Sequence, residues 1–171
     1  LVFKFTHIPI LKQQLQKDLN ESLKIANRLK RAVLGMVMTA IKNKEILKRQ
    51  QLSKNTSDVV ELEKQSQLTD EEIMDLLAGE IKKRKESAEQ FKLGGREELS
   101  QKELSEIEIL LAYLPEQLDE KTIRTEVQKI ITELGASSSK DIGRVIGATM
   151  TKLKGRIDGG MASKIIKELL Q

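Results

Sequence analysis

Apolar residues recur every three to four positions along most of this chain, which is the spacing that places them on one face of an α-helix. No internal repeat and no sustained heptad interrupts the pattern. In the first two thirds of the sequence this spacing predicts four helices, at residues 9–27, 29–47, 69–93 and 96–113. Between the second and third of these, Gln50 to Gln67 is polar and poorly periodic. This segment is predicted to be a surface loop with a short turn at Val59–Leu62.

Local signals predict where several helices begin and end. Thr69 with Glu72 three residues later is typical of a capping box, and Gly94-Gly95 is a helix stop. Pro115 breaks the helical pattern. We therefore predict a domain boundary there, with an N-terminal helical domain at 9–114 and a C-terminal domain at 119–171.

The C-terminal part predicts three short amphipathic helices. Asp119, Ser138 or Ser139, and Asp158 are their candidate N-caps, and Gly135 and Gly155 are candidate stops. Three such helices can close a small core. The predicted fold class is all-α: an N-terminal bundle of long helices followed by a small C-terminal three-helix domain.

Composition supports this fold class and excludes several chemistries. The chain has 171 residues, 39% of them hydrophobic and only 2% aromatic, which argues against a sandwich or barrel. It has no cysteine, which excludes disulfides and thiolate catalysis, and His7 is its only histidine. It also lacks a phosphate-binding Walker loop and any dinucleotide-binding fingerprint. We predict no catalytic residue, no metal, no cofactor and no membrane span.

Charge is segregated along the sequence. Residues 1–57 carry 12 basic and 3 acidic side chains (+9), residues 58–120 carry 8 and 18 (−10), and residues 121–171 carry 10 and 5 (+5). Two interpretations remain open at this point. The basic ends attract a polyanion, or the segments neutralise each other within the fold or in a homo-oligomer.

Two charged helical segments are predicted to have structural roles. The cations of Lys82–Lys85 are expected to pair with Glu80, Glu86 and Glu89 one helical turn away. Glu103, Glu106 and Glu108 are expected to form a solvated helix face.

A second basic cluster, near the carboxyl end, is predicted to bind a sugar-phosphate backbone. We call it the C-terminal basic set, and its members are Lys140, Arg144, Lys152, Lys154, Arg156 and Lys164. It surrounds the glycine-containing turn Gly155–Gly160, where backbone can approach a ligand and the next helix is expected to offer free N–H groups to a phosphate. No aromatic residue is present for base stacking, so shape and charge must carry the contact.

Several segments, in this order, resemble the YqeY family, whose domain also forms the C-terminal tail of the GatB subunit of tRNA-dependent amidotransferase. They are Ala40–Asn43, Leu68–Glu72, Glu80–Ser87, Tyr113–Leu118, Leu134–Ser138, Lys140–Gly143, Val145–Gly147 and Lys154–Gly159. The sequence departs from the family at Gly35, where Arg is expected, at Thr151, where Pro is usual, and in the longer loop Gln50–Gln67.

The resemblance implies an all-α fold divided near Pro115 and a role linked to amidation of Glu-tRNA(Gln) or Asp-tRNA(Asn). In that system the tail holds the tRNA while other subunits perform the glutamine-dependent carbon–nitrogen ligation. Carried over by position, the C-terminal Lys and Arg residues contact the tRNA backbone.

The principal hypothesis is therefore an accessory tRNA-binding protein, with tRNA or another structured RNA as partner and a cytoplasmic location. A mitochondrial matrix location is the alternative. A second hypothesis is a helical adaptor for an amidotransferase or aminoacyl-tRNA synthetase subunit, which would dock on the acidic helices. A third is glutamine-dependent ligase activity of the chain itself, which no nucleophile or nucleotide loop in the sequence supports.

Overall fold

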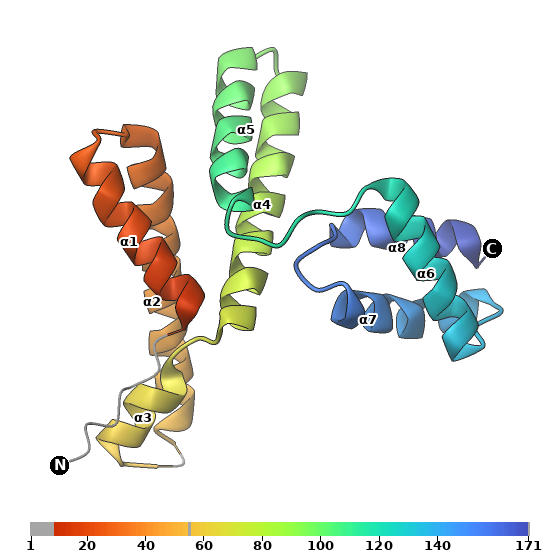
Figure 1. Cartoon of the computed structure of the whole chain (residues 1–171), viewed down its shortest axis with the longest axis horizontal. Coiled ribbons are helices and arrows are strands. Elements are labelled where there is room, and N and C mark those ends of the chain that lie inside the picture. Colours follow the sequence, from red (N-terminus) through yellow and green to blue (C-terminus); the bar gives the residue numbers. More distant parts are fainter. Residues whose placement is uncertain (1–8, 55, 171) are drawn as a thin grey trace. The chain divides into compact units, whose positions relative to one another are not determined.

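A computed structural model describes residues 9–54 and 56–170, and over these ranges the chain is helical with no β-strand (Figure 1). The all-α prediction is confirmed. The helices are α1 (Ile10–Lys24), α2 (Arg28–Leu52), α3 (Val59–Ser66), α4 (Asp70–Leu93), α5 (Glu97–Leu111), α6 (Glu120–Leu134), a 3₁₀ turn η1 (Ser139–Asp141), α7 (Ile142–Lys152) and α8 (Gly159–Leu169). His7 lies outside the described residues.

The chain divides into two compact units between Tyr113 and Leu114. In the N-terminal unit, α1 packs against α2 and α4 packs against α5, each pair as a helical hairpin (Figure 1). Its fully buried side chains come from α1, α2, α4 and α5, and the largest are Leu15, Val33, Leu34, Val37, Ile41, Ile73, Leu77 and Leu110. All eight are apolar side chains that face the interior of this unit.

In the C-terminal unit, α6, α7 and α8 contact one another around a core of their own. Ile123, Val127, Val145, Ile165 and Ile166 are all at most 1% exposed in this core. The entering segment is attached to the turn between α7 and α8, because the Leu118 N–H donates to the Arg156 carbonyl over 2.9 Å.

Helix ends follow the local signals. Thr69 and Glu72 form the reciprocal capping box, and the Asp119 carboxylate accepts a hydrogen bond from the Thr122 N–H at 2.7 Å. Gly135 ends α6 with a φ of 62°, the left-handed conformation that glycine adopts without steric cost. These predictions are confirmed. They could be made from the sequence because each motif involves only neighbouring residues.

The prediction of a loop over Gln50–Gln67 is wrong in part. Helix α2 continues to Leu52, and Val59–Ser66 forms α3. The Asp58 carboxylate caps α3 by accepting from the N–H groups of Val60 and Glu61, and Leu62 is buried against the unit. Eight residues with one buried leucine are too short to show helical periodicity, and packing of α3 on α2 stabilises the helix.

A buried ion pair connects α4 with α5. The Arg84 Nε donates to Glu106 over 3.0 Å and its Nη1 donates to Glu80 over 2.8 Å, while Arg84 and Glu106 are 7% and 8% exposed. Burial alone would lower the pKa of Arg84, but the hydrogen bonds to the two carboxylates outweigh it and raise that pKa. The expectation of a solvated Glu106 is wrong, because its helix face packs on α4.

The neighbouring cations behave as expected. Lys83 pairs with Glu80 at 2.9 Å and Lys82 lies 3.9 Å from Glu86, and both lysines are exposed. The basic run on α4 is therefore mostly accounted for by ion pairs along the same helix.

Tyr113, the last residue of the N-terminal unit, is attached to α1. Its hydroxyl donates to the Asp18 carboxylate over 2.6 Å, and the Lys30 ammonium lies 3.2 Å from the same oxygen. Partial burial opposes ionisation of Asp18, but the hydrogen bonds from Tyr113 and Lys30 outweigh it and lower the Asp18 pKa. Burial, followed by the Asp18 carboxylate, raises the pKa of Tyr113 well above its usual range.

The absorbance of tyrosinate at 295 nm tests this network, because Tyr113 is the only tyrosine and the chain has no tryptophan. We expect the midpoint in folded protein to lie well above the value of about 10 found for an unfolded chain. The contact then contributes stability below pH about 10 that is lost as pH rises through the folded pKa. Asp18→Asn is expected to lower the midpoint. A native midpoint equal to that in denaturant would contradict the contact.

Two further features bear on function. In the described ranges no helix is both long and apolar enough to span a membrane. Within those same ranges no three His, Cys, Asp or Glu side chains gather in a way that could hold a metal ion.

Candidate nucleic-acid interface

The C-terminal basic set divides into three groups on the folded unit. Lys140 and Arg144 lie where η1 leads into α7, and Lys152, Lys154 and Arg156 lie at the other end of α7 and in the turn that follows. Lys164 lies within α8. Arg144 and Lys152 are eight residues apart, a rise of about 12 Å along the helix.

The group at the end of α7 faces acidic residues of α6. The Lys152 ammonium bonds both carboxylate oxygens of Glu133, at 3.0 and 3.1 Å. The pKa of Glu126 is lowered, first by a hydrogen bond from Lys129 and further by the positive charges of Lys152 and Arg156. The end of α7 therefore lies against α6, where the Glu133 carboxylate holds the Lys152 ammonium.

The group at the start of α7 is held by α6 and η1. The Arg144 guanidinium donates to the Leu134 carbonyl at the end of α6 over 2.8 Å and lies 3.4 Å from Asp141. Lys140 is exposed and forms no side-chain ion pair with any described residue. Arg144 thus has a structural role as well as an exposed charge.

The remaining cations differ in accessibility. Lys154 is half-buried, whereas Lys164 is exposed and contributes, after Arg124, to lowering the pKa of Glu168. Arg156 is exposed, and its Nε is 3.5 Å from the Glu116 carbonyl, at the limit of a hydrogen bond. Lys140, Arg156 and Lys164 consequently present the most accessible charges of the set.

The ion pairs of this unit are exposed ones. The side chains of Lys152 and Arg144 are 45% and 55% exposed, and Glu133 is 61% exposed. Exposed pairs contribute little to stability and exchange partners readily in salt solution. The carboxylates therefore reduce the local positive charge without burying the cations.

The prediction that the first turn of α8 offers free N–H groups to a phosphate is wrong. The Asp158 carboxylate accepts the N–H groups of Gly160 and Met161 at 2.9 and 3.1 Å, so these amides are occupied and an anionic group already lies there. The carbonyl of Gly155 is likewise occupied, by the side chain of Gln117 at 2.6 Å. The amides of Gly160 and Met161 are therefore not available to a polyanion, and the charge at this turn comes from the side-chain cations.

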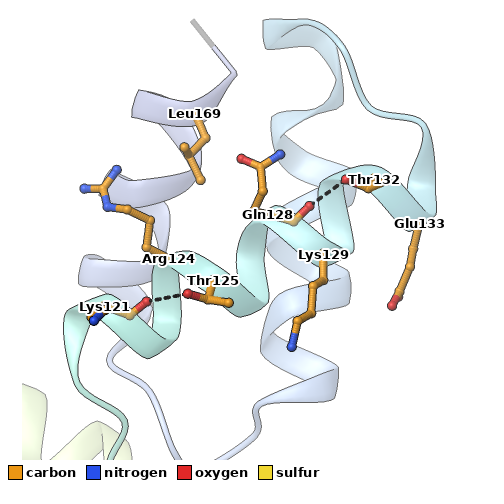
Figure 2. Close-up of a pocket in the computed structure, with 8 residues that line it drawn as sticks. All are labelled: Lys121, Arg124, Thr125, Gln128, Lys129, Thr132, Glu133 and Leu169. Atoms are coloured by element: carbon orange, nitrogen blue, oxygen red, sulfur yellow. Dashed lines mark hydrogen bonds between the residues drawn. The ribbon is translucent and has the colours of Figure 1, made fainter.

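An open groove of about 750 Å³ runs along α6, and none of the predicted site residues lines it (Figure 2). Its lining residues are Lys121, Arg124, Thr125, Gln128, Lys129, Thr132, Glu133 and Leu169. The hydroxyls of Thr125 and Thr132 donate to carbonyls of their own helix (Figure 2). Arg124 bonds Glu168 at 2.7 Å and Lys129 bonds Glu126 at 2.6 Å. The groove therefore presents mainly aliphatic surface and no general base beside a nucleophile.

Lys129 was not predicted as a candidate site residue, although it lines the groove together with Glu133, the partner of Lys152. Lys129 and Glu133 belong to α6, and only the packing of α7 on α6 brings Lys152 to this helix. No short-range signal in the sequence marks that proximity.

A family model described as Yqey-like protein matches residues 12–170. The chain belongs to the YqeY family. The match spans both compact units and includes every member of the C-terminal basic set. Among curated protein sequences, none matches this member of the YqeY family.

Proposed function

We propose that this YqeY-family protein binds structured RNA, tRNA in the first place, through the C-terminal basic set and performs no bond-forming chemistry itself. One observation supports this function most directly. Lys140, Arg156 and Lys164 are exposed cations on one small unit, and none forms an ion pair with a described residue. Such cations release counterions when they contact phosphates, which is the main source of affinity for nucleic acid.

The remaining cations extend the contact. Lys152 and Arg144 exchange Glu133 and Asp141 for phosphate, and the helices hold the side chains in place before RNA arrives. With no aromatic residue in the set to stack on bases, recognition rests on the shape and spacing of the RNA backbone. A folded RNA is therefore preferred over an unstructured strand.

Family membership supports a place in tRNA-dependent amidation. The protein would hold Glu-tRNA(Gln) or Asp-tRNA(Asn) in the cytoplasm while a separate amidotransferase carries out the glutamine-dependent step. Purified chain alone is then expected to form no amide, and amide formation by it would contradict a purely accessory role.

Neutralising the three unpaired cations tests RNA binding. The triple variant Lys140→Gln/Arg156→Gln/Lys164→Gln is expected to bind bulk tRNA about tenfold more weakly at low salt. The slope of log affinity against log salt is expected to fall by up to about three, since each lost phosphate contact removes about one. Filter binding over a range of salt concentrations measures both quantities.

A matched control removes the same charge elsewhere. Lys92→Gln/Arg96→Gln/Lys102→Gln also neutralises three exposed cations, here in the acidic hairpin of α4 and α5. Its affinity and slope should stay within about twofold and one unit of the parent. Equal losses in both triples would mean that net charge alone draws the RNA.

Nuclease treatment separates RNA binding from a protein adaptor role. Partners recovered from lysate on the tagged chain are expected to be lost after nuclease. Retention of an amidotransferase or synthetase subunit after nuclease, with the tRNA affinity of the first triple unchanged, would favour the adaptor.

A further inference from the structure

Two classes stand out among the basic residues of the N-terminal segment. One class is neutralised internally: Lys12 pairs with Glu45 at 2.6 Å, Lys30 with Asp18 at 3.2 Å and Lys48 with Glu72 at 2.9 Å. These pairs also connect α1, α2 and α4. The internal-neutralisation interpretation therefore holds for this class.

The other class lies on the solvent side of α2. Arg28, Arg31 and Lys42 are exposed, and their side chains form no ion pair with any residue in the described ranges. At 100° per residue the three lie within an arc of about 60°, whose centre is roughly 130° from the centre of the buried side of the helix. That buried side is formed by Val33, Leu34, Val37 and Ile41. We call the three cations the α2 basic face.

No acidic side chain interrupts the α2 basic face. The only acidic residue of α2 is Glu45, and its carboxylate is taken by Lys12 and by the Leu68 N–H. Ordinary solvent faces of helices alternate charges, which gives favourable pairs one turn apart. The face has instead a single sign over a rise of about 21 Å from Arg28 to Lys42.

Helix α2 would be more stable with acidic residues in its first turn in place of basic ones. Its first turn contains no acidic residue and carries Arg28, Lys30 and Arg31, although cations at a helix N-terminus oppose the helix dipole. Local helix energetics therefore does not explain why Arg28 and Arg31 are here. Contact with an external anion would explain both residues.

The surface between the cations suits close approach of a backbone. An open groove there is lined by Arg31, Ala32, Gly35, Met36, Thr39, Ala40 and Asn43. A Cβ added at Gly35 would meet no atom within 4 Å, so there is open space in front of this position. Met36, 48% exposed, is the only large apolar side chain in the groove.

We infer that the α2 basic face is a second RNA-binding surface, which contacts the phosphodiester backbone of a structured RNA. A duplex presents several phosphates over the length of the face. A protein partner is disfavoured, because stable protein interfaces have a core of aromatic and large apolar anchors that this groove lacks. The inference rests on the proposed function, because structured RNA is the partner in both. It adds a second binding surface, on the N-terminal unit.

The acidic surface of a second copy is the competing occupant. Several acids of residues 58–120 are already used internally: Asp70 accepts the Leu11 N–H at 2.9 Å, and Glu72, Glu80 and Glu106 bind cations. This reduces the negative charge that a second copy offers. Sedimentation of the RNA-free protein at low salt measures self-association directly.

Full-length variants test the inference against bulk tRNA. Arg28→Gln/Arg31→Gln/Lys42→Gln is expected to lower affinity about tenfold at low salt and to reduce the salt slope by two to about three. The control Lys64→Gln/Lys92→Gln/Lys102→Gln, with the same net charge, should stay within about twofold of the parent. Unchanged far-ultraviolet circular dichroism and melting temperature establish that both variants fold.

A variant that adds a positive charge to the α2 basic face is expected to change RNA affinity in the opposite direction. Gly35→Lys adds a cation to the middle of the face at a position with open space and improves helix propensity. Its affinity is expected to rise a few-fold and its salt slope to increase by about one. Gly79→Lys, the same change at another helical glycine with open space, in α4 and away from this face, is the control and should leave both unchanged.

The outcomes separate this inference from the proposed function. Losses in both the α2 triple and the C-terminal triple support both surfaces. A loss only in the C-terminal triple overturns the α2 surface, and a loss only in the α2 triple overturns the C-terminal surface. Parent-like tRNA binding by the α2 triple together with loss of self-association would assign the face to a second copy and overturn the inference.

Discussion

Replacing Arg84 with methionine is expected to destabilise the N-terminal unit by about 3–5 kcal/mol. Methionine fills a similar volume, so the loss comes mainly from the Glu106 carboxylate, which stays 8% exposed without its 3.0 Å partner. An unpaired buried charge has lost its hydration and gained nothing in return. Urea unfolding followed by the fluorescence of Tyr113, the only tyrosine of this unit, measures the change.

A double variant distinguishes the unpaired charge from lost packing. Arg84→Met/Glu106→Met removes both charges, and it is expected to recover most of the stability, because an apolar pair of similar volume often equals a buried ion pair. Lys83→Met, one residue away and 73% exposed at its side chain, controls for the substitution itself and should change stability by less than about 0.5 kcal/mol. A double variant as unstable as Arg84→Met would show that the charge was not the cause.

Replacing Ile166 with alanine is expected to cost the C-terminal unit about 2–5 kcal/mol. Ile166 lies in α8, is fully buried, and belongs to the cluster formed with Ile123, Val127 and Val145. A three-helix unit of this size has a small core and only a few kcal/mol of stability, so the variant is expected to unfold much of it at room temperature.

Hydrogen exchange with peptide-level mass spectrometry measures this loss where it occurs. Backbone amides of α6, α7 and α8 are expected to lose most of their protection in Ile166→Ala, and tRNA affinity should fall with them. Met161→Ala, on the same helix but 42% exposed, is the control and should keep parent-like protection. Parent-like protection of α6 and α8 in Ile166→Ala would contradict the assigned core.

Features set by neighbouring residues could be predicted from the sequence, whereas features set by distant residues could not. The caps at Thr69, Asp119 and Asp158 were predictable, since each joins a side chain to an amide at most three residues away. Helix α3 was not, because packing against α2 stabilises it and its own eight residues do not. The buried state of Glu106 depends on Arg84, 22 residues earlier, and a polar residue on a helix carries no mark of such a partner.

The candidate interface shows the same division. Residue type and spacing suffice to predict the helices, the apolar stripes that form the cores, and the concentration of cations toward both ends. Which of these cations are neutralised depends instead on how the helices pack. Lys12, Lys30 and Lys48 meet carboxylates across helices, whereas Arg28, Arg31 and Lys42 do not. An ion pair depends on distances of a few ångströms between segments far apart in the chain, and packing sets those distances.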